Sequence, residues 1–203
     1  MRADAEASRL RTEGSSWVLS RFTGKMPGMA KKSESQVWSA WATAWGPVGA
    51  VASERGVCRF ILPHYTMRDL EQLLAWEHKD AVRDDSAFSD LTILSREYFN
   101  GKMVDFSGIC CDLPAEGSFS GVVLRACREV PYGKTVGYLA LAKQIGREDA
   151  ARAVATALSK NHVPLIIPCH RVIYSGGGMG GFTAEGGVDL KKRMIDLERR
   201  NAG

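Results

Sequence analysis

The sequence predicts an α+β protein with a small antiparallel sheet in its first half and a mostly helical second half. Two observations support this prediction. Short apolar runs separated by tight turns occupy residues 37–62, which is the pattern of antiparallel strands. Apolar side chains then recur at three- and four-residue intervals in the later segments, which is the pattern of amphipathic helices. The 203 residues are enough to bury a substantial core.

Three regions are expected along the chain. Residues 1–33 are polar and weakly patterned, which indicates a flexible N-terminal extension. Residues 34–113 form the predicted N-terminal α/β domain, and residues 114–203 form the predicted C-terminal domain. The segment 102–117 has glycine, proline and mixed polarity, and we expect it to be the linker between the two.

The predicted sheet has three strands, at residues 37–45, 48–53 and 57–62. Two tight turns join them, at residues 46–47 and 54–56. Two helices follow, at residues 66–78 and 89–101. Thr66 and Asp69 are placed as a capping pair for the first helix, and Gly101 can close the second.

The C-terminal domain opens with a helix whose apolar stripe comprises Phe119, Val122, Val123, Ala126, Cys127 and Val130. Cys127 is therefore expected to be a small core residue. Two short helices at 136–146 and 147–161, separated by a tight turn, have the pattern of a helix-turn-helix. A last helix is predicted over 188–200.

The second helix of this pair has a small, polar and basic face, formed by Arg152, Thr156, Ser159 and Lys160. Such a face allows a nucleic-acid backbone to come close, and an ordinary solvated helix face is the alternative interpretation. The C-terminal part of the chain is also the more basic one. Residues 121–203 carry 13 Lys and Arg against 7 Asp and Glu, whereas residues 1–120 carry 14 Lys and Arg against 16 Asp and Glu. A basic C-terminal half favours a polyanionic partner, although a solvated surface would also explain it.

The five cysteines are irregularly spaced, and no two form a CxxC pair. This pattern favours neither a zinc site nor a secreted disulfide framework, so reduced thiols in a cytosolic compartment are expected. The opening "MRADAEASRLRTEG" has no apolar core of a secretory signal, and no apolar stretch approaches the roughly 18 residues of a membrane span. We expect a cytoplasmic protein, or a nuclear one in a eukaryote, that does not bind membranes.

One cysteine stands apart, in the segment "PLIIPCHRV" at 164–172. His170 follows Cys169 directly, and a nearby imidazole can activate a thiol as a nucleophile. Adjacent side chains in an extended chain point to opposite sides, so a bridging water fits better than a direct bond. The alternative is a buried, unreactive thiol, against which the flanking prolines and the glycine-rich "SGGGMGG" argue.

The last helix offers a partner for the histidine. Leu190, Met194 and Leu197 form its apolar face, and Glu198 lies beside Met194 at the edge of that face. A carboxylate at such an edge needs a partner, and His170 would serve. Alternatively, Glu198 is a surface residue paired with a nearby Lys191, with Arg199 or with solvent.

Several ordered motifs resemble those of the methylated-DNA–protein-cysteine methyltransferases, also called alkylguanine-DNA alkyltransferases. The motifs are "IPCHRV" at 167–172, "VPYGKTVGYLALAKQIG" at 130–146, "ARAV" at 151–154, Asn161, "GGF" at 180–182 and "LKKRMIDLE" at 190–198. "YFNGK" and "VGAVASERGVCRFIL" resemble the N-terminal domain of the family, which is ribonuclease H-like. The resemblance runs from about residue 35 to residue 198.

This resemblance implies a role for each residue of the site. Cys169 is the thiolate that accepts an alkyl group from O6-alkylguanine, and O4-alkylthymine is a second implied substrate. His170 takes the thiol proton through water, and Glu198 orients His170. Tyr138 donates a proton or a hydrogen bond to the departing guanine. Asn161 holds the active-site turn.

The resemblance also implies a minor-groove complex with double-stranded DNA in which the damaged base is flipped out. Arg152 is the finger that fills the gap in the stack. The other implied DNA contacts are Ala151, Thr156, Ser159, Tyr138 and Arg171. The implied base pocket is lined by Val163, Pro164, Ser175, Gly176 and Phe182. The alkyl group stays on the thiol, so each monomer reacts once and irreversibly, without metal or organic cofactor.

Two other functions stay open at this point. The first is a non-enzymatic alkyl-lesion binder of the alkyltransferase-like type, which shares the fold but lacks the cysteine. The second is a thiol hydrolase, whose nucleophile and base usually come from separate chain segments and which needs no basic recognition helix. The presence of Cys169 argues against the first, and the basic helix argues against the second.

Overall fold

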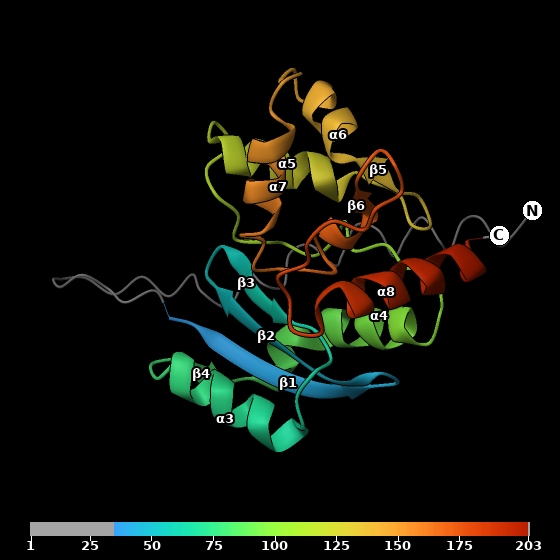
Figure 1. Ribbon diagram of the computed structural model, residues 1–203. Helices are drawn as coiled ribbons and strands as arrows, with labels where there is room; N and C mark the ends of the chain where they lie inside the picture. The colour runs from blue at the N-terminus through green and yellow to red at the C-terminus, as the bar shows by residue number, and fades with distance from the viewer. Residues whose placement is uncertain (1–34, 203) are drawn as a thin grey trace, which may run out of the picture.

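A four-stranded sheet lies in the lower part of the computed structural model, which describes residues 35–202 (Figure 1). Its strands are β1 (Val37–Thr43), β2 (Gly46–Ser53), β3 (Gly56–Ile61) and β4 (Val82–Arg83), in the order β3-β2-β1-β4. The predicted α+β class is confirmed. The expected extension at residues 1–33 lies outside the described residues.

The β1–β2 turn falls two residues earlier than predicted. Gly46 already pairs with Thr43, and Pro47 pairs with Ala42, so the predicted turn at 46–47 is wrong. The Thr43 hydroxyl accepts a hydrogen bond from the Trp45 backbone N–H at 3.3 Å and donates one to the Gly46 carbonyl at 2.6 Å. Gly46 opens β2 directly after this turn, and its φ of +126° is one that only glycine adopts readily.

The sheet is mixed rather than purely antiparallel. β1 and β2, and β2 and β3, pair antiparallel as predicted, but β4 pairs parallel to β1. The sequence did not predict β4, because two residues are too short to show a period.

One helix covers each face of the sheet. α3 (Met67–Glu77) packs its buried Leu70 and Leu74 against Trp38 and Val51. α4 (Ser89–Phe99) lies on the other face, where the indole N–H of β1 residue Trp41 donates to the Ser95 hydroxyl at 2.8 Å. Alternate β1 side chains therefore enter different layers, as strand geometry requires.

The predicted helix ends in this half are confirmed. Thr66 accepts a hydrogen bond from the Asp69 backbone N–H at 3.2 Å, which caps α3. Gly101 follows α4 with φ +86° and donates its N–H to the Tyr98 carbonyl at 2.8 Å.

The segment 102–117 connects the two halves but is fastened along its length. The Val57 N–H donates to the Cys110 carbonyl and the Asp112 N–H donates to the Val57 carbonyl, both at 2.9 Å. The guanidinium of Arg128 donates to three backbone carbonyls of this segment. The expected linker is thus a packed connection. The boundary between the two domains stays a prediction.

The upper part of the molecule contains α5 (Phe119–Arg128), α6 (Tyr138–Gln144) and α7 (Ala151–Leu158) (Figure 1). The helix-turn-helix pair is present, with Gly146 at φ +68° closing α6. α6 begins two residues later than predicted, because β5 (Val136–Gly137) pairs with β6 (Val172–Ile173). α7 is shorter than the predicted 147–161, because residues 147–150 form the turn.

The buried face of α5 differs from the predicted stripe. Val123, Leu124 and Cys127 are buried, whereas Val122 is 37% exposed. Cys127 is fully buried, so its predicted place in the core is confirmed.

α8 (Gly187–Asn201) runs beside α4, between the sheet and the upper helices (Figure 1). One cluster of buried hydrophobic side chains extends from Trp41 and Phe99 in the first half to Val123, Leu141 and Met194 in the second. The two halves are therefore packed on a common core. No helix among the described residues has the length and apolar character that crossing a membrane requires.

Candidate active site

The cysteine is presented by a strained turn at residues 161–169. The Asn161 side chain donates to the Ile167 carbonyl at 2.9 Å and accepts from the Val163 N–H at 3.1 Å, so it ties the two sides of the turn together. Leu165, at the tip, has φ +74°, an unfavourable conformation for a branched side chain. The expected role of Asn161 in holding this turn therefore has a direct structural basis.

Cys169 lies at the start of a 3-10 turn, Cys169–Arg171, and is 9% exposed. The Asn161 amide also donates to its Sγ, at 3.1 Å. Burial raises the pKa of the Cys169 thiol, while this hydrogen bond and the nearby Lys191 ammonium lower it. The site therefore offers stabilisation to a thiolate, but burial alone would keep the thiol protonated, so a base is needed.

His170 is the candidate for that base, and it is fully buried. Its Nε2 lies 2.6 Å from Oε1 of Glu198 on α8. Since a carboxylate only accepts, Nε2 carries the proton and Nδ1 is the basic nitrogen. Nδ1 is buried and has no hydrogen-bond partner in the part of the chain that the structure describes. Burial lowers the pKa of His170, and Glu198 opposes that shift.

Glu198 is an ionised carboxylate at the centre of a buried network. Burial raises its pKa, but the hydrogen bonds from His170 and Arg171 and the charge of the Arg171 guanidinium outweigh burial and hold the pKa at about 2. The Gly133 N–H also donates to Oε2, at 3.0 Å. The alternative of a surface Glu198 paired with Lys191 or Arg199 is therefore wrong.

Arg171 does not lie where a DNA contact was expected. Its guanidinium donates to both Glu198 oxygens, at 2.9 and 3.1 Å, and to the Val130 carbonyl at 2.6 Å. The residue is 6% exposed. The 3-10 turn directs this side chain inward, so Arg171 supplies the counter-charge for Glu198 and has no free donor face for a phosphate.

Lys191 is a site residue that the sequence did not reveal. It is completely buried, and its ammonium donates to the Val172 carbonyl at 2.6 Å. It also lies 5.8 Å from the centre of the Tyr138 ring. Burial lowers the pKa of Lys191, whereas the neighbouring thiols Cys169 and Cys127 raise it. The available signal was its spacing, three residues before Met194 and seven before Glu198 on the same helix face.

A small cavity of about 120 Å³ opens onto the cysteine. It is lined by Tyr138, Ala155, Leu158, Ser159, Cys169, Tyr174, Gly181, Phe182 and Thr183. Tyr138 forms one wall, with its ring 5.2 Å from that of Tyr174. A Cβ added at Gly180 would lie 2.5 Å from the Tyr138 hydroxyl, so a glycine allows the neighbouring loop to approach this closely.

The predicted pocket residues are only partly found at this cavity. Phe182 lines it, but Val163 and Pro164 are buried in the turn behind the cysteine. Ser175 and Gly176 are exposed at the tip of the neighbouring loop and do not line it. Sequence reasoning missed Tyr174, whose exposed ring follows β6; an aromatic residue beside a glycine-rich loop was the available signal.

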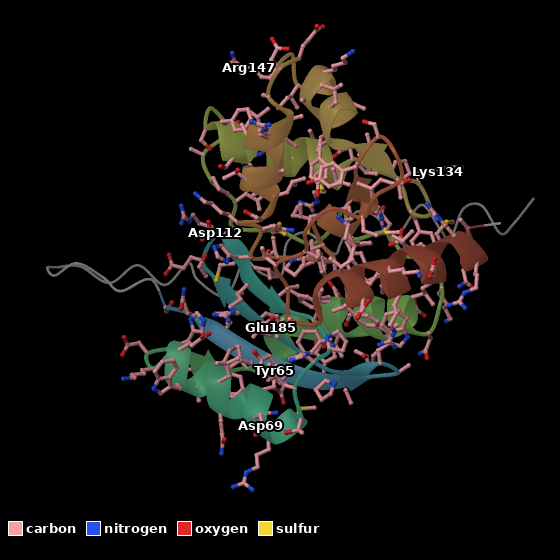
Figure 2. All side chains as sticks on the ribbon, viewed as in Figure 1. Tyr65, Asp69, Asp112, Lys134, Arg147 and Glu185 are labelled. Atoms are coloured by element: carbon pink, nitrogen blue, oxygen red, sulfur yellow. The ribbon has the colours of Figure 1, made fainter. Side chains whose placement is uncertain are left out.

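The loop that closes the cavity is held from two sides. The Thr183 hydroxyl donates to the Ser159 carbonyl at 2.9 Å, at the end of α7. The Tyr65 hydroxyl, from the N-terminal half, donates to the Glu185 carboxylate at 3.3 Å, and Figure 2 shows these two residues close together. Both halves of the molecule therefore position the cavity wall.

α7 joins this cavity to the predicted DNA-binding face. Ala155 and Leu158 contact the cavity, while Arg152, Thr156 and Ser159 are exposed. The Thr156 and Ser159 hydroxyls donate to carbonyls of their own helix, which leaves a smooth surface. The Arg152 guanidinium makes no hydrogen bond or ion pair within residues 35–202. Ala151 is half-buried at the start of the helix.

The face continues toward the turn of the helix pair, where Arg147 lies at the end of the molecule opposite Asp69 (Figure 2).

All five cysteines are unpaired. Within residues 35–202, no group of three or more His, Cys, Asp or Glu side chains is arranged to hold a metal ion.

The fold and the site together define a DNA-binding protein of the helix-turn-helix type that holds a buried thiol, followed by a histidine paired with a carboxylate, beside its second helix. The comparisons with known proteins agree. Residues 118–200 match the family described as "6-O-methylguanine DNA methyltransferase, DNA binding domain". The methylated-DNA–protein-cysteine methyltransferase of Mycobacterium tuberculosis is 35% identical over 67% of this chain and 80% of its own length. The inducible enzyme of that name from Bacillus subtilis is 33% identical over 66% and 75%.

A third relative, from Mycolicibacterium paratuberculosis, is 41% identical over 52% of this chain and 61% of its own length. Among solved structures, the O6-methylguanine methyltransferase of M. tuberculosis has a TM-score of 0.67 and 28% identity, covering 83% of this chain and 95% of that one. A structure of the M. tuberculosis protein in complex with DNA also has a TM-score of 0.67, at 27% identity over 81% and 93%. The chain belongs to the methylated-DNA–protein-cysteine methyltransferase family and is an enzyme of that class.

Proposed function

We propose that this protein repairs duplex DNA by transferring the alkyl group of O6-alkylguanine, and of O4-alkylthymine, to Cys169 in a single irreversible reaction. The observation that carries the proposal is the position of the cysteine. Its sulfur accepts a hydrogen bond from Asn161 at 3.1 Å and lines a cavity that α7 borders. His170 follows it directly in the chain, and the buried Nε2 of His170 lies 2.6 Å from the Glu198 carboxylate.

The chemistry balances with the groups present. The thiol proton passes through a water molecule to Nδ1 of His170, and Glu198 stabilises the imidazolium that forms. The sulfur then forms a bond to the alkyl carbon while the bond from that carbon to the guanine O6 breaks. The electron pair returns to the base, and Tyr138 donates a hydrogen bond or a proton to it. A thioether is a poor leaving group, so each molecule reacts once.

The base is expected to reach the cysteine by flipping out of the duplex. The smooth exposed surface around Thr156 and Ser159 suits close approach in the minor groove, and the free guanidinium of Arg152 suits entry into the vacated stack. The M. tuberculosis protein solved in complex with DNA supports DNA as the partner. We propose that the protein acts as a monomer, since one copy carries the thiol, the base and the DNA-facing helix.

A transfer assay with duplex DNA that carries a labelled O6-methyl group tests this function. We expect the label to move to the protein and to stop at one group per molecule. A lesion binder would bind the duplex and leave the label on the DNA. A thiol hydrolase would release the label into solution over repeated cycles. Either result would contradict the proposal.

A further inference from the structure

The catalytic network receives a buried hydroxyl from the N-terminal half of the chain. Tyr98 lies in the last turn of α4 and is fully buried. Its Oη donates to Oε1 of Glu198 at 2.8 Å, across 100 positions of sequence. This is the same carboxylate oxygen that accepts the His170 Nε2–H at 2.6 Å. Arg171 Nη2 donates to it as well, at 3.1 Å, so Oε1 has three donors, and Tyr98 is the one that comes from the N-terminal half.

The direction of the Tyr98 bond follows from proton counting. Its hydroxyl also lies 3.4 Å from His170 Nε2, but that nitrogen carries a proton and cannot accept another. Tyr98 has one proton to give, and the carboxylate is the nearer acceptor. Burial, followed by the charge of Glu198, raises the pKa of Tyr98 well above its ordinary value, so the hydroxyl keeps its proton.

Packing fixes the ring that carries this hydroxyl. Edge contacts surround it, with ring centres of Phe99, Phe106, Tyr132 and His170 between 5.2 and 6.4 Å away. A rigid ring offers the carboxylate a hydroxyl at a defined position, which is the condition for a supporting residue to orient a catalytic group. The α4–α8 contact is thus part of the site as well as of the core.

Resting on the proposed alkyl transfer, we propose that Tyr98 is a positioning residue for the reaction. Its hydroxyl fixes the Glu198 carboxylate so that His170 presents Nδ1 toward Cys169, and it withdraws charge from Oε1 so that His170 stays a neutral base. The N-terminal half thereby supplies one donor to the catalytic network. Tyr98 touches neither the thiol nor the substrate cavity.

The groups around Glu198 and His170 determine the direction in which Tyr98 shifts the pKa of His170. Four titratable groups face Glu198 and His170. They are Tyr98 of α4, Tyr132 of the loop after α5, Arg171 of the 3-10 turn and Lys191 of α8. Without the Tyr98 hydroxyl, Oε1 holds more negative charge and stabilises an imidazolium more strongly. The pKa of His170 should rise, and the acid limb of the reaction should move to higher pH.

Tyr98→Phe in the full chain tests the proposal, and Tyr132→Phe is its matched control. Tyr132 packs 6.1 Å from Tyr98, and its own buried hydroxyl has no hydrogen-bond partner among residues 35–202. Each variant removes one buried hydroxyl and keeps the ring. The substrate is O6-benzylguanine as the free base, which removes DNA binding from the measurement. A single-use reaction gives two readouts: the end point counts folded molecules, and the rate constant reports the chemistry.

We expect Tyr98→Phe to react about fivefold more slowly at neutral pH, with the acid limb displaced upward by roughly half a pH unit and an unchanged end point. Tyr132→Phe should keep the wild-type rate and profile. A lower end point with a wild-type rate constant would overturn the proposal, because it would make Tyr98 a purely structural residue.

An NMR titration of the His170 ring in the same three proteins keeps this test separate from the proposed function. The pKa of His170 should rise in Tyr98→Phe only, and equal values in all three proteins would overturn the role of Tyr98. Failure of the wild-type protein to react with any alkylated substrate would refute the alkyl transfer instead, while the titration would still decide whether Tyr98 controls His170.

Discussion

His170 Nε2 and Glu198 Oε1 lie 2.6 Å apart, with both side chains removed from solvent. This contact joins the turn that carries the cysteine to the last helix of the chain. Because Glu198 also accepts from Arg171, one carboxylate serves as the orienting group for the base and as the counter-ion of a buried guanidinium. We therefore expect catalysis and stability to depend on the same residue.

Glu198→Gln should lower the free energy of unfolding and should also make that free energy less sensitive to acid pH. Removing one partner of a buried ion pair costs about 3–5 kcal/mol, because Arg171 keeps its charge. The pKa of Glu198 is depressed to about 2 from 4.5, so its contribution to stability is complete above about pH 4.5 and is lost as the pH falls toward 2. Denaturant unfolding at pH 7 and pH 3 measures both effects.

The stability difference between wild type and Glu198→Gln should therefore be large at pH 7 and smaller at pH 3. Asp196→Asn is the control, since this residue lies on the same helix outside the buried network. A difference that does not change with pH would show that the carboxylate contributes through packing alone.

Arg152→Ala should slow reaction with alkylated duplex on the order of a hundredfold and leave reaction with free O6-benzylguanine nearly unchanged. The reason is that, in the proposed reaction, Arg152 fills the gap left by the flipped base, and unstacking that base costs a few kcal/mol. Lys160→Ala, on the same exposed surface, removes an equal charge and should cause only a mild, salt-dependent loss of affinity. Equal slowing on both substrates would exclude the finger role.

Gly180→Ala should impair the reaction by displacing Tyr138. A Cβ at this position would lie 2.5 Å from the Tyr138 hydroxyl, and the residue has φ +66°. Gly176→Ala in the same loop meets no atom within 4 Å and should react like wild type. Rates on free base and on duplex, with the end point as a folding check, measure the effect. A wild-type rate for Gly180→Ala would mean that the Tyr138 hydroxyl does not need its present position.

Lys191→Met should make Cys169 less reactive at neutral pH. The Lys191 ammonium lowers the pKa of the thiol, so its removal should raise that pKa and move the reactive range to higher pH. Alkylation of Cys169 by iodoacetamide across a pH series, followed on its peptide, measures this. Lys192→Met, at the exposed neighbouring position, is the control. Identical profiles for the two variants would show that the buried ammonium does not act on the thiol.

Much of the framework could be predicted from periodicity and end signals. The β1–β3 strands, the Thr66 cap and the helix pair all have local causes, and local causes are visible in sequence. β4 and the β5–β6 pair are two-residue elements that exist because a distant strand lies beside them. The segment 102–117 looked like a linker because its hydrogen bonds go to β3 and Arg128, and such partners leave no periodic pattern.

The chemistry of the site was predictable where it depends on residue type, and less so where it depends on the direction in which a side chain points. Cys169, His170 and Glu198 were found from their types and spacing. Arg171 was expected to contact DNA, because the direction in which the 3-10 turn points its side chain is not visible in the sequence. Tyr98 and Lys191 were missed, since buried polar side chains on amphipathic helices are recognised only once their partners are in place.

The central claim is that Cys169 is the acceptor of a single alkyl group. Incubation of the protein with excess O6-methylated duplex, followed by peptide mass analysis, tests it most directly. We predict one added methyl group per molecule, carried by the peptide that contains Cys169, and no addition in Cys169→Ala, which should still bind the duplex. A methyl group on the Cys127 peptide, or substrate consumption beyond one equivalent, would contradict the account.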